Sequence, residues 1–169
     1  AQKGRFREFY QCDIDVIGNE SLSLMYDVEI PSIIYDIFKK LNFGKFQIQI
    51  NNRKLLSGFF DALELNDLVS DILRIIDKID KIGLDAVKDE LRLLDISDDK
   101  IEKIAEFILI EGTTEEKLEK LENLGIQNDT FREGLEELKF VIEGLKCMSV
   151  DSDYYTINLT IARGLDYYT

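Results

Sequence analysis

The chain has 169 residues, of which 45% are hydrophobic, and its 21 basic and 34 acidic side chains give a net charge of −13. That length and apolar content predict one ordinary folded domain, or a small domain with a sizeable insertion, and argue against a disordered chain. The negative charge argues against broad adhesion to nucleic acid or anionic membrane, so any phosphate contact must be local and geometrically defined.

Two scarce residue types restrict the chemistry further. The sequence has no histidine, which removes Ser/His and Cys/His catalysis, histidine-bound metals and the usual general base. Neither Cys12 nor Cys147 completes a CxxC or Cys/His ligand set, so we expect free thiols in a reducing cytosol. No apolar run reaches the roughly 18 to 20 residues of a membrane span, and no signal peptide opens the chain. We therefore expect a soluble, cytoplasmic protein with no membrane partner.

The first predicted element is a strand over residues 4–18, GRFREFYQCDIDVIG. Because side chains alternate along a strand, one face collects charged, amide and aromatic groups, which are Arg5, Arg7, Phe9, Gln11, Asp13 and Asp15. Paired guanidiniums suit phosphate oxygens, an aromatic ring suits a base, and an amide with a carboxylate suits an ammonium group. The alternative is a solvated sheet face on which the two arginines pair with carboxylates.

Residues 26–44 come next, YDVEIPSIIYDIFKKLNFG, and their apolar spacing predicts an amphipathic helix. Pro31 fits the first turn of that helix better than its interior. KFQIQI, residues 45–50, alternates as a strand, and residues 51–63 predict a second helix with Asn51 or Asn52 as its N-cap. We interpret NNRK, residues 51–54, as a helix start with solvated side chains.

From about Leu63 to Asp151 the sequence is helical throughout and rich in Leu, Ile, Glu and Lys. Helix starts are predicted at Ser97, at Thr113 or Thr114, and at Asn128 or Asp129. The Glu and Lys content is more typical of a solvated face with i,i+4 pairs than of a specific binding surface. Residues 154–160, YYTINLT, return to strand chemistry, so two strand-rich ends flank a helical insertion and are expected to pair in one sheet.

The last stretch, ARGLDYYT over residues 162–169, is the second candidate for chemistry. Gly164 permits a close backbone approach, Arg163 supplies a charge, and Asp166, Tyr167 and Tyr168 add an acid and two rings with polar tips. The alternative is a turn with a salt bridge and core tyrosines. Both candidate stretches adjoin the predicted sheet and not the helical block, which favours one shared site.

At these residues the chain resembles a known family. GRFREFYQCDIDVIG resembles the second half of motif 2 of the histidyl-tRNA synthetases, which are class II aminoacyl-tRNA synthetases, and IARGLDYYT resembles their histidine-specific signature. INNRKLLSG and a helical insertion lie between the two in the same order, so the resemblance covers essentially the whole chain. It implies an α+β fold, in which an antiparallel-sheet catalytic domain is interrupted by an all-helical insertion domain. Residues 1–62 and 152–169 would then be parts of the catalytic core, and residues 63–151 the insertion.

The resemblance also implies a role for each motif residue on the ATP side of the site. Phe9 would stack on adenine, and Arg5 and Arg7 would bind the triphosphate. Arg163 would be the catalytic residue, stabilising charge at the α-phosphate as pyrophosphate leaves. Mg²⁺ would be bound mainly through ATP, with no metal ligand set of the protein's own.

On the amino-acid side, the resemblance implies that Gln11 and Asp15 hold the substrate L-histidine and that Tyr167 and Tyr168 line the pocket for its imidazole. The acceptor end of tRNA(His) would lie near the insertion domain, and the full-length protein would be a homodimer.

Several family elements are missing from these 169 residues: motif 1, the Phe-Arg-x-Glu start of motif 2, motif 3 and the anticodon domain. The chain also begins without Met, and we expect a piece of a longer protein that is inactive alone. One alternative is the non-catalytic regulatory subunit of ATP phosphoribosyltransferase, which shares the catalytic fold. A third interpretation, a binding module built around the insertion, requires a clustered Lys/Arg patch on the helical block.

Overall fold

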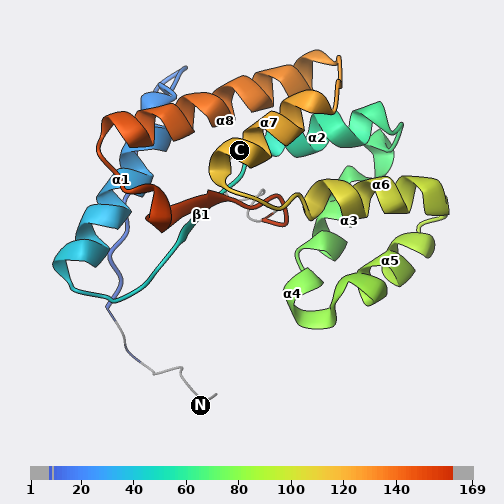
Figure 1. Ribbon diagram of the computed structural model, residues 1–169, viewed down its shortest axis with the longest axis horizontal. Helices are drawn as coiled ribbons and strands as arrows, with labels where there is room; N and C mark the ends of the chain where they lie inside the picture. Colours follow the sequence, from blue (N-terminus) through green and yellow to red (C-terminus); the bar gives the residue numbers. More distant parts are fainter. Residues whose placement is uncertain (1–7, 9, 162–169) are drawn as a thin grey trace.

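The protein is a helical assembly around a two-stranded sheet, and its computed structural model describes residue 8 and residues 10–161 (Figure 1). The elements in chain order are α1 (Met25–Lys40), β1 (Ile48–Ile50), α2 (Arg53–Ala62), η1 (Asn66–Leu68), α3 (Val69–Ile76), α4 (Ile79–Ile82), α5 (Leu84–Arg92), α6 (Asp98–Ile108), α7 (Thr114–Asn123), α8 (Asp129–Cys147), η2 (Ser152–Tyr154) and β2 (Tyr155–Ile157). Among these helices, none combines the length and apolar character needed to cross a bilayer.

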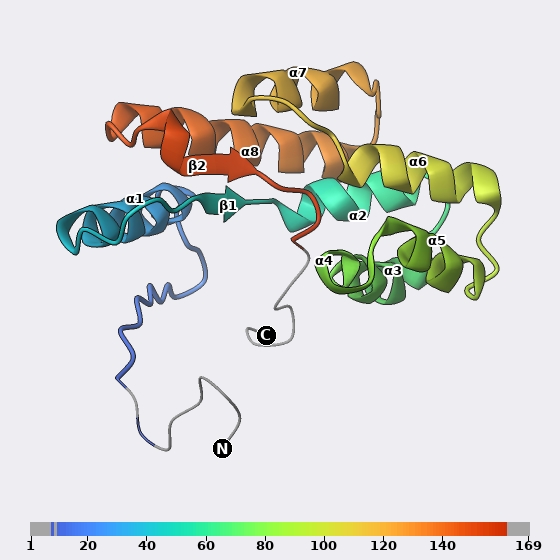
Figure 2. The ribbon, with the colours of Figure 1, turned by 60° about the horizontal axis from the view of Figure 1, so that its bottom comes forward.

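The sheet joins the two strand-rich ends of the sequence, as predicted. β1 pairs with β2 in register from Ile48 opposite Tyr155 to Ile50 opposite Ile157, and the two strands lie side by side in Figure 2. The α+β class is confirmed, but the antiparallel arrangement is not, because this pair is parallel. Parallel neighbours need a long crossover that returns the chain to the same end of the sheet, and the helices from α2 to α8 form that crossover.

The strand predicted over residues 4–18 is wrong for its described part. Residues 10–18 form neither helix nor strand. A strand is stable only when a neighbour takes up its backbone N–H and C=O groups, and in the described residues the sheet contains β1 and β2 alone. Alternation of side chains therefore predicted a strand without identifying a partner for it.

Helix α1 confirms the helix predicted over residues 26–44 but corrects the position of Pro31. The Ser23 hydroxyl accepts a hydrogen bond from the Met25 N–H at 3.3 Å, and the helix begins at Met25. Pro31 consequently lies in the interior of α1 and not in its first turn. Its missing N–H removes the bond that the Asp27 carbonyl would otherwise accept.

Three predicted helix starts are confirmed at the level of single hydrogen bonds. Asn52 caps α2 by accepting from the Lys54 N–H at 2.8 Å, and Asn128 caps α8 by accepting from the Phe131 N–H at 2.8 Å. Thr113 and Glu116 form a reciprocal capping box at the start of α7. Ser97 occupies the N-cap position of α6 with an extended backbone but makes no capping bond.

Helix α8 runs along the molecule and packs on both α1 and α2 (Figure 1). Its first half contacts α2 at two glycines. A β-carbon added to Gly134 would lie 2.3 Å from the Leu55 nitrogen, and one added to Gly58 would lie 2.4 Å from the Phe131 nitrogen. Its last turns contact α1, where Gly144 faces Val28. Backbone therefore packs directly on backbone between α2 and α8.

On the other side of α2, aromatic rings join it to α6. The rings of Phe59 and Phe107 stack with centroids 3.8 Å apart and planes 6° from parallel. Both side chains are buried in one hydrophobic cluster that extends from α1 to β2. The core is thus continuous from the sheet into the helical block.

We expect Gly134→Ala to lower the free energy of unfolding. Alanine is the better helix former by about 1 kcal/mol, so the substitution would stabilise α8 if there were room for the methyl group. The contact with the Leu55 backbone leaves none, and overpacking of this kind costs about 1–3 kcal/mol. Denaturant unfolding measures the difference. Glu143→Ala, on the exposed side of α8, is the control, and stabilisation by Gly134→Ala would contradict the close packing.

Candidate functional site

Most of the residues predicted to form the site lie outside the described residues. Those are Arg5, Arg7, Phe9, Arg163, Tyr167 and Tyr168. Gln11 and Asp15 are described, and both are exposed in a segment without helix or strand. The roles assigned to all eight residues therefore stay predictions, and the described part of the site is the surface where the chain leads into residues 162–169.

That surface is a cavity of about 640 Å³ among α1, β1, the start of α2 and α8. Ile161, the last described residue before the ARGLDYYT stretch, lines it. The charged and amide side chains of its wall are Asp27, Gln49, Asn51, Asn52, Arg53, Lys54 and Glu137, and Ile34, Leu73 and Val141 are among its apolar groups. The cavity adjoins the carboxyl ends of both strands, since Asn51 and Asn52 follow β1 and Ile161 follows β2.

One cluster of side chains ties the start of α2 to α8. The Lys54 ammonium contacts the carboxylates of Glu133 and Glu137, each at 2.5 Å, and the Asn52 amide donates to Glu137 at 2.8 Å. Burial alone would raise the pKa of Glu137, but hydrogen bonds from Lys54 and Asn52 outweigh it and lower that pKa. The hydrogen bonds to Glu133 and Glu137 raise the pKa of Lys54. Lys54 and Glu137 are therefore a charged pair at neutral pH.

Asp27 on α1 adds a second carboxyl to the cavity wall. Desolvation raises the pKa of Asp27, and the negative charge of Glu137 adds to the effect. The wall thus combines two cations, Arg53 and the paired Lys54, with two carboxyls, of which that of Asp27 has a raised pKa. Among the described residues, no group of three or more His, Cys, Asp or Glu side chains is arranged to hold a metal ion. Cys12 and Cys147 are free thiols, as predicted.

Asn51 is the residue of this region that the sequence interpretation missed. Its amide donates to the carbonyl of Ile161 at 2.8 Å and to that of Leu159 at 3.4 Å. NNRK does begin a helix, as predicted. Its side chains are not simply solvated, however, because Asn51, Asn52 and Lys54 are only partly exposed and form hydrogen bonds to other segments of the chain. One asparagine suffices to cap a helix, so the second was the signal that a further contact exists.

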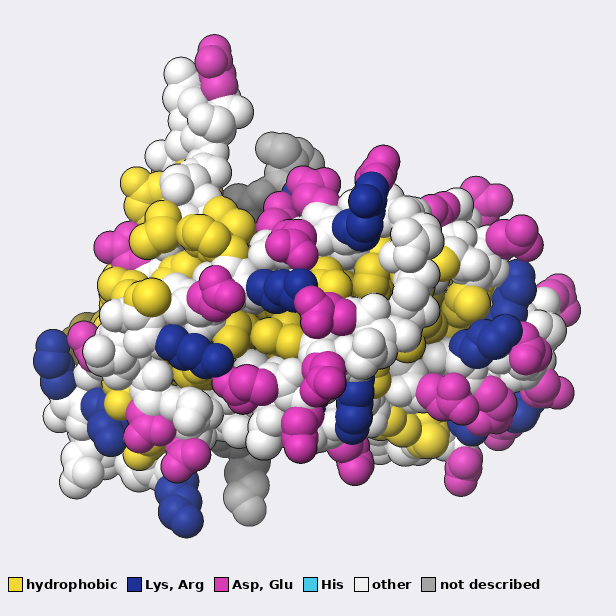
Figure 3. All heavy atoms as spheres, turned by 45° about the horizontal axis from the view of Figure 1, so that its top comes forward, with side chains coloured by type: hydrophobic (Ala, Val, Ile, Leu, Met, Phe, Trp, Pro, Cys, Tyr) yellow, Lys and Arg dark blue, Asp and Glu magenta, His cyan; other side chains and the backbone are white. Residues whose placement is uncertain are grey.

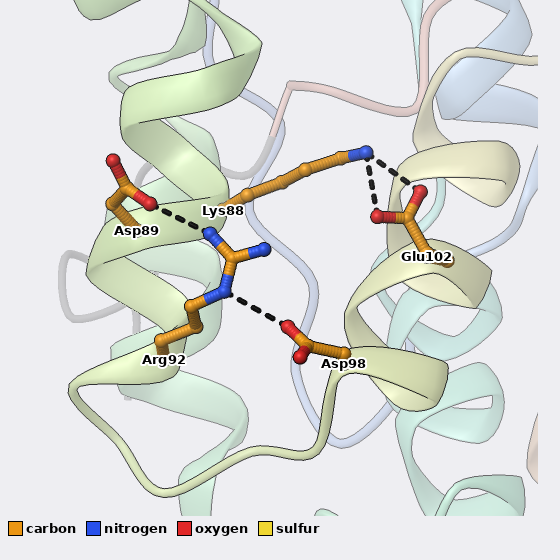
Figure 4. Close-up of polar contacts among 5 residues, drawn as sticks. All are labelled: Lys88, Asp89, Arg92, Asp98 and Glu102. Atoms are coloured by element: carbon orange, nitrogen blue, oxygen red, sulfur yellow. Dashed lines mark hydrogen bonds and ion pairs between the residues drawn. The ribbon is translucent and has the colours of Figure 1, made fainter.

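The helical block neutralises most of its own positive charge. Lys88 on α5 donates to both carboxylate oxygens of Glu102 on α6, at 2.8 and 2.6 Å, and Arg92 joins Asp89 to Asp98 (Figure 4). Lys117 and Lys120 donate to main-chain carbonyls instead. On the face shown in Figure 3, basic side chains alternate with acidic ones. The clustered Lys/Arg patch that a binding module would require is not seen on that face.

Comparison with known proteins identifies the class of protein to which the chain belongs. The family model for histidyl-tRNA synthetase matches residues 1–169. The chain therefore belongs to the histidyl-tRNA synthetase family, as its two end motifs predicted.

Individual relatives agree with that assignment. The chain is 56% identical to the histidine–tRNA ligase of Clostridium tetani and 49% identical to that of Finegoldia magna, each over 99% of the chain. It spans 38% and 39% of the lengths of those two proteins. The crystal structure of histidyl-tRNA synthetase from Nostoc sp. PCC 7120 matches 90% of this chain and 36% of that one, with 41% identity and a TM-score of 0.86.

We expect Glu137→Gln to reduce the free energy of unfolding by about 1 kcal/mol at pH 7, because it removes the charge that Lys54 and Asn52 stabilise. A carboxyl whose pKa is lowered by folding stabilises the protein above its unfolded pKa, and this contribution disappears as the pH falls through the folded value. The difference between variant and wild type should therefore shrink below about pH 4.3, the usual pKa of glutamate. Denaturant unfolding across this pH range measures it.

Glu133→Gln is the matched control for that experiment. Glu133 contacts the same lysine, but its side chain is 60% exposed, against 24% for Glu137. Glu133→Gln should reduce the free energy of unfolding by less than half as much as Glu137→Gln does, because exposed ion pairs are screened by water. Equal losses in the two variants, or a loss from Glu137→Gln that does not vary with pH, would show that the cluster does not stabilise the fold in this way.

Proposed function

We propose that the full-length protein activates L-histidine with ATP to form histidyl-adenylate and transfers the histidyl group to tRNA(His). The observation that carries the proposal is the match of the histidyl-tRNA synthetase family to all 169 residues. Relatives that share 43–56% of the sequence are histidine–tRNA ligases. The residues to which the two end motifs assign roles, from Arg5 to Tyr168, are also present in this sequence.

The proposed first step is an in-line displacement at the α-phosphorus of ATP. A carboxylate oxygen of histidine attacks, a new P–O bond forms, and the bond to pyrophosphate breaks with its electron pair leaving on pyrophosphate. Such a step needs no nucleophile from the protein, only positioning and positive charge. Arg163 supplies positive charge at the α-phosphate, and Arg5 and Arg7 bind the triphosphate whose base stacks on Phe9. The absence of histidine side chains is therefore compatible with this chemistry.

Gln11 and Asp15 are proposed to hold the amino-acid substrate, with the Asp15 carboxylate facing its α-ammonium group. Tyr167 and Tyr168 are proposed to line the imidazole pocket. Mg²⁺, bound mainly through the phosphates of ATP, supplies further charge neutralisation when present. In the second step, a ribose hydroxyl at the acceptor end of tRNA(His) attacks the adenylate carbonyl and AMP leaves.

The proposed division of the chain follows the family. Residues 1–62 and 152–169 belong to the catalytic core and residues 63–151 to the insertion domain, with the tRNA acceptor end near the insertion. Pairing of β1 with β2 supports this division, because it joins the two core segments across the insertion. Homodimerisation of the full-length protein and a cytoplasmic location are parts of the same proposal.

We expect the full-length protein to catalyse histidine-dependent exchange between ATP and pyrophosphate, and Arg163→Ala to reduce the exchange rate by at least 100-fold. Loss of a preorganised cation at the developing charge typically has an effect of about that size. Arg74→Ala is the control, since Arg74 is exposed and its ion pair among the described residues is with Asp71 on its own helix. A folded full-length protein that binds histidine but shows no exchange would instead indicate the regulatory relative of ATP phosphoribosyltransferase.

We expect the 169-residue chain alone to show no histidine-dependent exchange. In this family, motif 3 and the start of motif 2 supply further arginines that bind ATP. The 169-residue chain contains neither of these elements. The same assay, run at equal concentrations on this chain and on the full-length protein, tests the expectation. Measurable exchange by the shorter chain would show that its own cations suffice.

A further inference from the structure

The main-chain pairing between the two strands stops just before the ARGLDYYT stretch. The last such hydrogen bond runs from the Asn158 N–H to the Ile50 carbonyl, at 3.0 Å. β1 then turns into α2, because Asn52 caps that helix. Beyond the end of the partner strand, residues 158–161 form a turn in which the Ile161 N–H donates to the Asn158 carbonyl at 3.3 Å, and Leu159 is buried. Carbonyl groups in such a position still need hydrogen-bond donors.

The Asn51 side chain takes the place of the missing strand. Its amide nitrogen donates to the carbonyls of Ile161 and Leu159, and its amide oxygen accepts from the Asn52 N–H at 2.8 Å. Only one orientation of the amide satisfies all three bonds, because its partners are two acceptors and one donor. Aspartate has the same shape and keeps the bond to Asn52, but it cannot donate to a carbonyl.

We propose that Asn51 is a positioning residue that holds the backbone at Leu159 and Ile161 and thereby limits where the following Arg163 can act. The inference rests on the proposed function, in which Arg163 acts at the α-phosphate. Arg163 follows Ile161 by two residues, and two residues span at most about 7 Å. Asn51 thus holds the backbone two residues before the proposed catalytic cation, and Asn51 and Ile161 line the same cavity.

A positioning role differs from a purely structural role in its kinetic signature. If Asn51 acts by placing Arg163 for the transition state, its loss lowers kcat while the KM values for ATP and histidine change little. A displacement of about 1 Å can reduce a rate by up to 100-fold. A purely structural role would lower thermal stability and the fraction of active protein, without a selective effect on turnover by the folded enzyme.

The experiment uses the full-length protein with Asn51→Asp and the matched control Asn158→Asp. Both variants add one negative charge at the same end of the sheet. Asn158 loses only its amide bond to the exposed Gln49 side chain, while its side-chain oxygen still accepts from Thr160. In histidine-dependent exchange by folded protein, we expect Asn51→Asp to lower kcat 10- to 100-fold, with KM values within about threefold, and Asn158→Asp to stay within about twofold of wild type.

Trypsin cleavage after Arg163 is a second measurement that does not depend on activity. Followed by mass spectrometry in the native protein, the cleavage rate should rise at least fivefold in Asn51→Asp relative to Asn158→Asp, while cleavage after Lys39 and Lys40 stays unchanged. If the aspartate variant does not fold, Asn51→Ala, which removes the donor without adding charge, replaces it in both assays.

Two outcomes would overturn the inference: kcat equal in Asn51→Asp and Asn158→Asp, or equal cleavage after Arg163 in the two. Absence of exchange in the wild-type full-length protein is a separate result. It would overturn the proposed function, whereas activity in wild type with no difference between the variants would overturn only the role of Asn51.

Discussion

The close approach of α2 and α8 determines how the rest of this chain is arranged. Gly58 and Gly134 let the two backbones meet without intervening side chains. The contact brings Glu137 on α8 within reach of Asn52 and Lys54 at the start of α2. Farther along, α8 also packs on α1 and so returns the chain to the sheet. Strand β2 can pair with β1 because this returning helix is held in place.

The helical block and the cavity beside the strand ends differ in how their charged groups are paired. The chain carries a net charge of −13. Within the helical block, most basic side chains nevertheless form ion pairs with carboxylates, as between α5 and α6. The cavity beside the strand ends has a different character, with a Lys54–Glu137 pair, the Arg53 guanidinium, a carboxyl of raised pKa and several amide side chains. The motif segments would add further cations for an anionic substrate, since the sequence places Arg5, Arg7 and Arg163 there.

The sequence correctly predicted the features that depend on interactions between residues close together in the chain. The caps at Asn52, Thr113 and Asn128 were correct because each depends on residues within one helical turn. The strand over 4–18 failed because a strand depends on a neighbour that alternation cannot specify. Asn51 was missed for a related reason, since its partners Leu159 and Ile161 are 108 and 110 residues away along the chain. The family and the order of its motifs were nevertheless evident from two short stretches at the chain ends.

The pairing of β1 with β2 also has a kinetic and evolutionary consequence. Ile48 and Tyr155 meet only after the chain between them has closed into a loop, and the ends of that loop are brought together by the packing of α2 on α8. Contacts across a large sequence separation form later than local ones, so we expect the sheet to form together with, or after, the packing of α2 on α8. Because doubling the length of a flexible loop adds only about 0.6 kcal/mol to the closure cost, the helical block can change length while the strand ends beside the cavity keep their register.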